Sequence, residues 1–405
     1  MRGRILVTLG LLAIAVSTFA AIIVVVRLTR PVPPPRLALS TPASVTIGSG
    51  PIAPLPLPAQ GTVMLRSSVD GDIASRGADE PRPIGSVAKT MTALVTLDAK
   101  PLSVGDEGPT YVIAGNDVAL YNRAVADGGS TVAVSAGERF SERQMLLALL
   151  LPSANNLAES LALWVSGDRV AFLARLNARA AELGMSHTHF DDPDGFLDTT
   201  VSSAGDLVKL GDAVLANPAL SAIVATQAAT LPDGSVVPNL DSNLRQPGWL
   251  GIKTGSTNAA GGCLLFAAQR TPTGGGDPVR VVGAILGQPQ LGDALSTSLA
   301  IANAALMSYI HVDLLTLSSG IVGSLSTDWG DGTTTHVVTK AAAITARSGT
   351  LVTLTTEDSP LATPLTAGTT VARIHGAVSD REVTVYELQT TATVNPPGAG
   401  WRLTH

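Results

Sequence analysis

The stretch GSVAKTMTA, residues 85–93, decides the fold of this chain. The apolar residues that follow Gly85, at positions 87, 91, 94 and 95, recur at helical spacing and predict a helix that begins near Ser86. Ser86 and Lys89 would share one face of that helix because they are three residues apart. A serine beside an amine that can accept its proton is an activated nucleophile. Alone, Ser-x-x-Lys is more often an ordinary helix start.

A second polar motif holds Ser153 and Asn155, separated by one alanine. The segment before it, 141–151, opens with the Ser-x-x-Gln pattern of a capping box, and a helical pattern resumes over 157–165. We therefore expect Ser153 and Asn155 on a short, rigid connection between packed helices, pointing into a cleft. The alternative is a turn in which both side chains only cap helices.

The third motif is Lys-Thr-Gly at 253–255, which ends an extended run that starts at Trp249. A turn-rich segment, 256–262, and a second apolar run follow, so the region reads as an antiparallel hairpin. An edge strand can hold an extended peptide by main-chain hydrogen bonds while the lysine and threonine bind its terminal carboxylate. Glycine there permits close backbone approach. By itself, this motif is also just a polar strand end.

A lysine acts as a base near neutral pH only when its charged form is destabilised. Burial and a second nearby cation would both lower the pKa of Lys89, and Lys253 is the candidate for that cation.

With these three motifs the chain resembles the serine-type D-alanyl-D-alanine carboxypeptidases among the low-molecular-mass penicillin-binding proteins. The likeness runs from about Gly61 to Leu306 and includes further blocks at 149–155, 182–190 and 251–257. It implies an α/β (α+β) architecture, the penicillin-binding/β-lactamase-like transpeptidase fold with an antiparallel sheet and a helical cluster.

Position by position, the resemblance implies Ser86 as the acylated nucleophile and Lys89 as the general base. It implies Ser153 and Asn155 as proton relay and substrate contact, and the main-chain N–H groups of Ser86 and Ser256 as the oxyanion hole. The substrate-binding residues it implies are Lys253, Thr254, Gly255 and Ser256.

The activity implied is release of the terminal D-alanine from peptidoglycan stem pentapeptides through an acyl-serine, with β-lactam antibiotics acylating the same serine. Two alternatives stay open. A class A β-lactamase deacylates with a glutamate-bound water, and Glu159 and Glu182 lack the expected local pattern. The other alternative is a non-catalytic penicillin-binding sensor or cell-wall scaffold of the same fold.

The chain departs from the family in one respect. Many relatives carry an arginine soon after the last core strand to bind the substrate carboxylate, whereas residues 287–290 here read Gly-Gln-Pro-Gln. Carboxylate binding is then left to Lys253 and Thr254, or to Arg280 or Arg245.

The N-terminal segment, 1–30, reads as a transmembrane anchor. No residue from Ile5 to Val26 is charged, and a helix of that span is about 33 Å long, against about 30 Å for a bilayer core. A signal peptide cleaved near Thr18-Phe19-Ala20 is the competing interpretation. Both place the rest outside the cytoplasm, and we expect a single-pass protein of the cell membrane. The Pro-rich segment 31–60 then reads as an extended linker.

Beyond the catalytic domain, expected over 61–309, the pattern changes. Short runs rich in Val, Thr and Ile predict a small all-β domain over 310–394, with strands near 337–345, 351–355, 371–375 and 382–388. Residues 395–405 are expected to form a loose tail.

Composition narrows the partners. A net charge of −6 and a pI near 5.5 argue against nucleic acid. The single cysteine, Cys263, lies in an apolar run and is expected to be a buried thiol. His187 and His189, next to several aspartates, could suggest a metal, but no third ligand stands at a recognised spacing, so no metal or cofactor is expected.

Overall fold

The computed structural model describes residues 2–313, 323–330, 335–339 and 343–405. The chain divides into two compact units, Ile52–Ile310 and the combination of Met1–Pro51 with His311–His405. The motifs of the sequence analysis all lie in the first unit.

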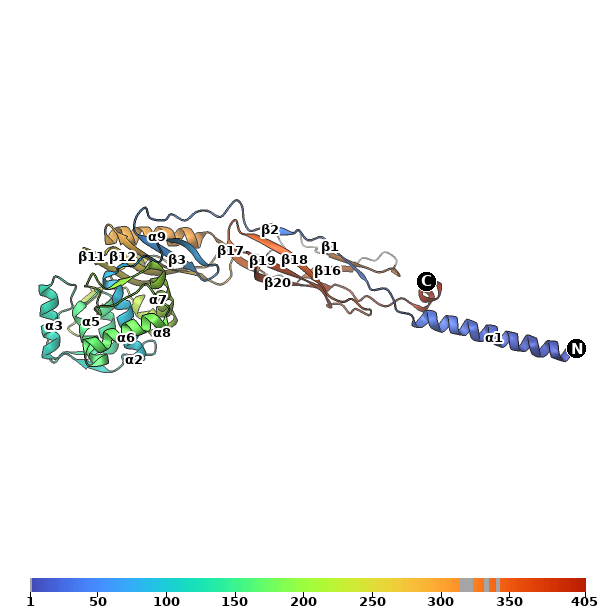
Figure 1. The fold of residues 1–405 in the computed structure, drawn as a ribbon, viewed down its shortest axis with the longest axis horizontal. Helices are drawn as coiled ribbons and strands as arrows, with labels where there is room; N and C mark the ends of the chain where they lie inside the picture. Colours follow the sequence, from blue (N-terminus) through green and yellow to red (C-terminus); the bar gives the residue numbers. More distant parts are fainter. Residues whose placement is uncertain (1, 314–322, 331–334, 340–342) are drawn as a thin grey trace. The chain divides into compact units, whose positions relative to one another are not determined.

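A five-stranded antiparallel sheet forms the centre of the unit Ile52–Ile310. Its strand order is β11-β12-β13-β3-β4, so β11 is an edge strand, as the sequence predicts. The bounds are β3 (Thr62–Ser67), β4 (Gly71–Arg76), β11 (Trp249–Thr257), β12 (Gly261–Arg270) and β13 (Val279–Gln288). Helix α9 (Leu291–Met307) covers one face of the sheet and the remaining helices lie on the other (Figure 1). This is the predicted α+β architecture.

The helical cluster is built around α2 (Lys89–Ala99), in which every residue from Lys89 to Leu97 is buried. A short 3₁₀ turn, η1 (Gly85–Ala88), precedes it. The helices around it are α3 (Gly115–Ala126), α4 (Glu142–Leu150), α5 (Asn155–Ser166), α6 (Arg169–Glu182), α7 (Ala204–Ala216) and α8 (Pro218–Val224). The central position of α2 fixes Lys89 deep inside the unit.

Three short strand pairs and one further turn complete this unit. They are β5 (Arg82–Pro83) with β8 (Val201–Ser202), β6 (Thr110–Val112) with β7 (Arg139–Ser141), β9 (Ala228–Thr230) with β10 (Val236–Pro238), and η2 (Ser242–Arg245).

Local signals in the sequence predicted several element starts. The capping box is confirmed, because Gln144 N donates to Ser141 Oγ at 3.1 Å and Ser141 N donates to Gln144 Oε1 at 2.9 Å. Two bounds differ from prediction. Asn155 is the first residue of α5 and not part of the connection, and β11 continues past Gly255, so the Lys-Thr-Gly motif lies within the strand.

The other unit contains a seven-stranded sheet of order β1-β15-β16-β20-β19-β18-β2, with β14 paired to β17 outside it. The bounds are β1 (Arg36–Leu39), β2 (Ser44–Thr46), β14 (Tyr309–Asp313), β15 (Gly323–Ser326), β16 (Thr335–Thr339), β17 (Ala343–Arg347), β18 (Leu351–Asp358), β19 (Thr370–Val378) and β20 (Arg381–Thr390). Strands therefore occupy the four predicted runs, although residues 340–342 of the first run lie outside the described residues.

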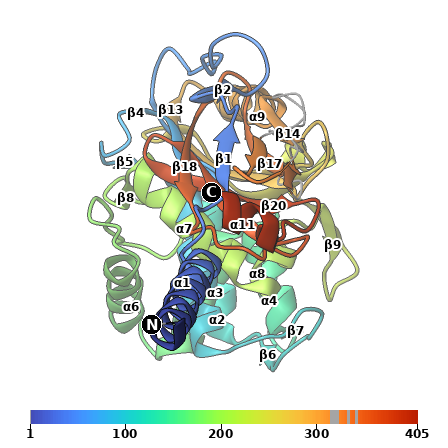
Figure 2. The same ribbon diagram turned by 90° about the vertical axis from the view of Figure 1, so that its right-hand side faces the viewer.

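The expected linker and tail are more structured than predicted. Within the segment 31–60, β1 pairs with β15 and β2 pairs with β18, so part of it belongs to the sheet. Ile47, just after β2, is fully buried, so the chain packs against its own unit there and is not an extended linker. Within the tail, Ala399–Thr404 forms helix α11, which lies against the end of α1 (Figure 2).

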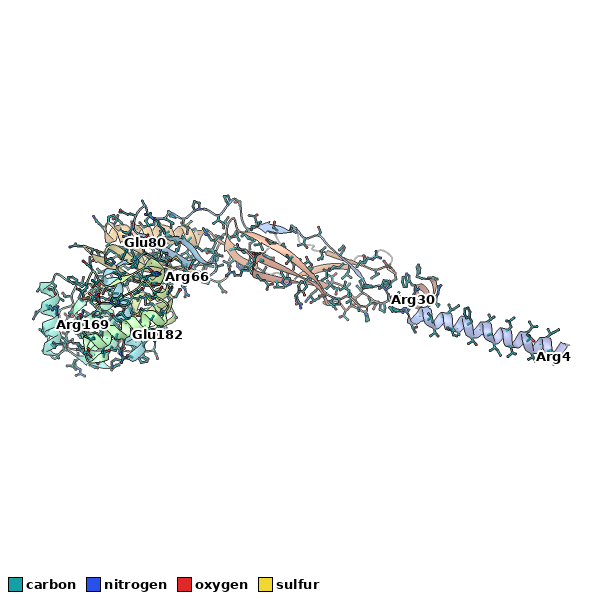
Figure 3. All side chains as sticks on the ribbon, in the orientation of Figure 1. Arg4, Arg30, Arg66, Glu80, Arg169 and Glu182 are labelled. Atoms are coloured by element: carbon teal, nitrogen blue, oxygen red, sulfur yellow. The ribbon has the colours of Figure 1, made fainter. Side chains whose placement is uncertain are left out.

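Helix α1 (Arg2–Thr29) contains Gly3–Thr29, the only single unbent helix in the described part of the chain that is long and apolar enough to cross a membrane. None of its most apolar window is buried. Arg4 stands near one end and Arg30 just past the other (Figure 3). Contact of this apolar surface with water is unfavourable.

Candidate active site

The predicted nucleophile and base are in direct contact. Lys89 Nζ lies 2.8 Å from Ser86 Oγ, and it donates to Asn155 Oδ1 and to the main-chain oxygen of Asp194, each at 2.8 Å. Three separate segments therefore meet at one buried amine. Ser86 lies in η1 and not inside α2, so the helix begins one turn later than predicted, at Lys89.

The electrostatic state of Lys89 follows from its burial. Burial lowers its pKa to about 8, against the raising influence of the charges on Asp194 and Asp192. With such a pKa, roughly a tenth of Lys89 is neutral at pH 7 and able to accept a proton.

The expected cause of this shift needs a correction. We predicted that burial and the charge of Lys253 would both lower the pKa of Lys89. Burial does so, whereas the charges that act on Lys89 are those of Asp194 and Asp192, which raise its pKa. The charge of Lys89 acts instead on Lys253. The pKa of Lys253 lies well below its ordinary value, first because of burial and second because of the charge of Lys89. An incoming carboxylate would raise the pKa of Lys253 again by favouring its charged form.

Strand β11 packs directly against the turn that carries Ser86. A Cβ on Gly255 would lie 2.5 Å from the carbonyl oxygen of Ile84, and a Cβ on Gly85 would lie 3.1 Å from the main-chain nitrogen of Ser256. Glycine at both positions is what lets the two backbones approach so closely. The side chains of Lys253 and Thr254 are nearly fully buried behind this contact, with Nζ 3.5 Å from Oγ1.

Ser153 and Asn155 play different parts in the geometry. Asn155 contacts Lys89, and its main-chain N–H donates to the oxygen of Ser130 at 2.8 Å, which anchors the start of α5. Ser153 has a φ of 69° and a buried Oγ that finds no hydrogen-bond partner among the described residues. A left-handed serine with an unsatisfied buried hydroxyl is a strained feature of the kind that clusters at active sites.

Sequence reasoning missed one contributor, the loop that carries Asp192 and Asp194. The carboxylate of Asp192 accepts from the main-chain N–H groups of Gly195 and Leu197 and from Thr200 Oγ1, which fixes the loop and brings the carbonyl of Asp194 to Lys89. The carboxyl of Asp194 is itself buried, and burial is the main reason that its pKa rises to about 7. The Asp-Pro-Asp-Gly sequence of this loop predicts a turn, but nothing in it indicates that the turn contacts Lys89.

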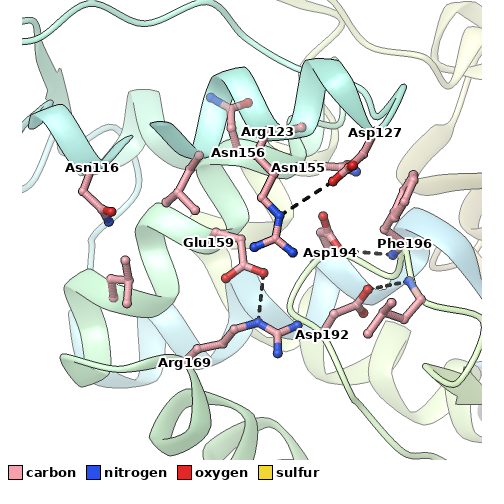
Figure 4. A pocket seen from close by; sticks show the side chains of 14 residues that line it. Asn116, Arg123, Asp127, Asn155, Asn156, Glu159, Arg169, Asp192, Asp194 and Phe196 are labelled. Atoms are coloured by element: carbon pink, nitrogen blue, oxygen red, sulfur yellow. Dashed lines mark hydrogen bonds and ion pairs between the residues drawn. The ribbon is translucent and has the colours of Figure 1, made fainter. Parts of the chain in front are cut away.

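A cavity of about 570 Å³ opens beside these groups. Asn155 and Asp194 both line it, so it borders the surroundings of Lys89 (Figure 4).

The remaining candidates lie elsewhere. Arg245 and Arg280 are exposed, and no hydrogen bond or ion pair within the described residues joins either to Lys253 or Thr254. Cys263 is buried, as predicted, and burial raises the pKa of its thiol to about 11.

Three side chains that we considered for a metal site or for a β-lactamase have polar partners. His189 Nε2 lies 3.0 Å from Asp191 Oδ1. Glu159 pairs with Arg169 at 3.1 Å, and Glu182 pairs with Arg179 at 2.9 Å.

Known proteins resemble this chain in fold and in sequence. The solved structure of the Streptomyces K15 DD-transpeptidase matches with a TM-score of 0.55 and 27% identity, over 62% of this chain and 98% of that one. A D-alanyl-D-alanine endopeptidase of Pseudomonas aeruginosa is 34% identical over 247 residues, 57% of this chain and 74% of the relative. The D-alanyl-D-alanine carboxypeptidase DacB2 of Mycobacterium tuberculosis is 35% identical over 212 residues, 49% of this chain and 66% of the relative.

The fold is thus that of the serine DD-peptidases. A family model described as D-alanyl-D-alanine carboxypeptidase matches residues 58–287. The chain belongs to that family, and it is a serine-type hydrolase, as the motifs indicated.

Proposed function

We propose that this protein removes the terminal D-alanine from peptidoglycan stem pentapeptides through an acyl-enzyme on Ser86, while anchored to the cell membrane by α1. The observation that carries the proposal is the 2.8 Å contact between Ser86 Oγ and Lys89 Nζ, at a lysine whose pKa is about 8. A base of that pKa is suited to accept a proton near physiological pH.

Acylation begins when neutral Lys89 takes the hydroxyl proton of Ser86 as Oγ attacks the carbonyl between the two terminal D-alanines. Main-chain N–H groups of Ser86 and Ser256 stabilise the oxyanion, and loss of one such donor typically costs about 100- to 1,000-fold in rate. The amide bond breaks and D-alanine leaves with a proton that reaches its nitrogen from Lys89 through Ser153. Water then attacks the ester carbonyl, and Ser86 Oγ regains its proton.

Substrate binding is divided between the two sides of the site. Lys253 and Thr254 hold the terminal carboxylate, whose negative charge restores the charged state of the buried lysine. Asn155 has its Oδ1 on Lys89 and so can offer Nδ2 to a substrate carbonyl.

The test is mass spectrometry of the protein after incubation with a pentapeptide and, separately, with penicillin. We expect D-alanine release and a penicilloyl adduct in the wild type, neither in Ser86→Ala, and both in Ser75→Ala, an exposed serine in β4. D-alanine release or an adduct in Ser86→Ala would refute the assignment. Rapid turnover of penicillin would favour a β-lactamase, and an adduct without D-alanine release would favour a sensor or scaffold.

A second candidate function is endopeptidase action on cross-linked peptides, because the Pseudomonas relative carries that name. A cross-linked dimer of stem peptides in the same assay distinguishes endopeptidase from carboxypeptidase action. Release of the monomeric peptides would show endopeptidase activity.

A further inference from the structure

Three segments that are far apart in the sequence meet at the end of α1. They are the last turn of α1, helix α11 and the loop between β15 and β16, and all three belong to the same compact unit. Figure 2 shows α11 beside the end of α1. Six side chains form the group that we call the junction: Arg27, Arg30, Trp329, Trp401, Arg402 and Leu403.

Arginine side chains join α1 and α11 in both directions. Arg402 Nη1 donates to the main-chain oxygen of Leu28 at 2.7 Å and to that of Arg30 at 3.2 Å. In return, Arg27 Nη1 donates to the main-chain oxygen of Leu403. The last carbonyls of a helix have no partner within that helix, so a cation there satisfies them and is favoured by the helix dipole. These contacts therefore order the end of α1 and hold α11 beside it.

Two tryptophans lie at the same place. The rings of Trp329 and Trp401 meet edge to face with their centroids 5.9 Å apart, and Trp329 Nε1 donates to the main-chain oxygen of Asn395 at 3.0 Å. Both rings are half-buried, and Leu403, two residues after Trp401, is 38% exposed. The chain has four tryptophans, so half of them stand in the junction. Aromatic rings that are partly open to their surroundings are typical of the boundary between hydrocarbon and water.

The arginines of the junction have no acidic partner. Among the described residues, no carboxylate oxygen lies within 4.0 Å of a side-chain nitrogen of Arg27, Arg30 or Arg402. Asp328, an acid in the loop between β15 and β16, pairs instead with Arg36 at 3.3 Å. Each guanidinium has five N–H groups, so the bonds to main-chain oxygens leave donors available. A phosphate group, which is anionic and rich in acceptor oxygens, fits this charge.

The position of the junction along α1 indicates what it faces. The uncharged run of α1 ends at Val26, and the four residues 27–30 extend about 6 Å further. The headgroup layer on each side of a bilayer core is about 5–7 Å thick. With α1 across the core, the carbonyls that Arg402 binds are therefore at headgroup depth, and α11 lies beside them.

We propose that the junction lies in the headgroup layer of the membrane that α1 spans, with its two tryptophans among the headgroups and its three arginines on anionic phospholipid. The inference rests on the proposed anchoring by α1 and goes beyond it, because residues 399–405 and the loop after β15 give the membrane a second contact. A soluble anionic polymer would satisfy the arginines but not the aromatic pair, whereas a bilayer surface suits both. The unit that holds the seven-stranded sheet is thereby attached to the bilayer by more than α1.

The first experiment measures depth. The full-length protein is placed in nanodiscs whose lipids carry bromine near the headgroup end of the acyl chain, where it quenches the fluorescence of nearby tryptophans. We expect a loss of about a quarter or more of the emission, because two of the four tryptophans lie at that depth. Replacing both, by Trp329→Phe and Trp401→Phe, should abolish the quenching. Trp164→Phe, in α5 of the other unit, is the matched control and should leave the quenched intensity unchanged.

The second experiment tests the charge. Two nanodiscs contain the same mixture of phosphatidylglycerol and phosphatidylcholine, but only one of the two lipids is brominated in each. We expect quenching to be about twofold stronger or more when phosphatidylglycerol carries the bromine, because the arginines enrich that lipid around the tryptophans.

Variants assign this ratio to the junction. Replacing Arg27, Arg30 and Arg402 together by Gln should bring the ratio close to one, and Arg270→Gln, an exposed arginine in β12, should leave it unchanged. Because Arg402→Gln also removes bonds to α1, Arg30→Gln is the safer single variant. Only its main-chain oxygen bonds to Arg402, so this change keeps the contacts with α11 and should lower the ratio by itself.

The outcomes separate this inference from the proposed function. Fluorescence needs no turnover, so quenching in Ser86→Ala supports the junction even if no D-alanine is ever released. A chain that enters nanodiscs but shows no quenching by the shallow bromine overturns this inference alone, and a chain that does not enter them contradicts the anchor as well. Quenching that survives the double tryptophan replacement would also overturn the inference. So would equal quenching by the two brominated lipids in the wild type, because the arginines would then recruit no anionic phospholipid.

Discussion

Lys89 is the residue on which three segments of the chain converge. Its Nζ contacts Ser86 in η1, Asn155 at the start of α5 and the carbonyl of Asp194 in a distant loop. All three partners are neutral atoms, and the charges of Asp194 and Asp192 offset only part of the burial that lowers the pKa of the lysine to about 8. The arrangement therefore holds the amine in place while its charged form remains less favourable than in water.

The pH dependence of acylation follows from this residue. We expect the rate at which a fluorescent penicillin acylates Ser86 to rise about tenfold per pH unit below pH 8 and to level off above it, because the neutral fraction of Lys89 does so. Stopped-flow measurements from pH 6 to pH 9 would check it. Lys89→Arg, which stays charged, should be about 100- to 10,000-fold slower. Equal wild-type rates at pH 6 and pH 8 would contradict the role of Lys89.

Glu142 gives a second prediction, on stability. It is fully buried, its two carboxyl oxygens have no hydrogen-bond partner among the described residues, and burial raises its pKa from 4.5 to about 7. Between pH 4.5 and pH 7 the folded state keeps a proton that the unfolded chain releases. The free energy of unfolding therefore falls as pH rises, by up to about 1.4 kcal/mol per pH unit from this group.

Glu142→Gln stays neutral and should remove that slope. We expect the variant to be more stable than the wild type at pH 8 and close to it at pH 4.5, as measured by urea unfolding at both pH values. Glu182→Gln, on the exposed face of α6, should change stability by no more than about 0.5 kcal/mol at either pH. A variant no more stable than the wild type at pH 8 would show that the burial of Glu142 carries no such cost.

Among the elements, the contact between β11 and η1 sets the distance between Ser86 and the strand that we propose binds the substrate. Gly255→Ala would place a Cβ 2.5 Å from the carbonyl oxygen of Ile84 and 3.1 Å from Val87 N, both main-chain atoms. The strand must move away, and displacement by about 1 Å costs about 100-fold in rate.

The rate constant for penicillin acylation and the Tm of the variant measure the effect. Gly292→Ala in α9 is the matched control, since nothing lies within 4 Å of the added Cβ there, and it should acylate at the wild-type rate. If Gly255→Ala also acylates at that rate, β11 does not position the substrate.

The elements that sequence predicted well are those set by local patterns. Ser141 and Gln144 cap α4 because the two side chains are three residues apart, and the spacing of Ser86 and Lys89 placed them together for the same reason. The carbonyl of Asp194 could not be predicted to meet Lys89, because that contact joins residues 105 positions apart. Every residue has a main-chain oxygen, so the residue type at position 194 does not indicate that its oxygen contacts the lysine.

The segment 31–60 shows the same limit at the level of strands. Its prolines favoured an extended linker, and β1 and β2 are indeed short, at four and three residues. They are ordered by partners more than 280 residues away, β15 and β18, which only the folded sheet brings within reach. The apolar residues in this part of the segment, such as Val45 and Ile47, are too few to predict this pairing.

For the whole molecule, the N-terminal residues divide into two parts with different roles. Helix α1 exposes its apolar side chains and none of its most apolar window is buried, so its removal costs little packing beyond its contacts with α11. Residues 36–47 are different, because β1 and β2 pair in the seven-stranded sheet and Ile47 exchanges main-chain hydrogen bonds with Thr350 and Gly349.

Two shortened chains test this division. A chain that begins at Pro31 should be soluble without detergent and hydrolyse a pentapeptide with kcat/KM within about twofold of the full protein, which should partition into membranes or detergent. A chain that begins at Ile52 should keep comparable activity, because the motifs lie in the unit Ile52–Ile310, but lose order in the sheet that follows. Limited proteolysis should then cut it after residue 310 at least tenfold faster than the chain from Pro31. Equal resistance of the two chains would mean that β1 and β2 contribute nothing to that sheet, and a full-length protein that stays soluble without detergent would argue against α1 as an anchor.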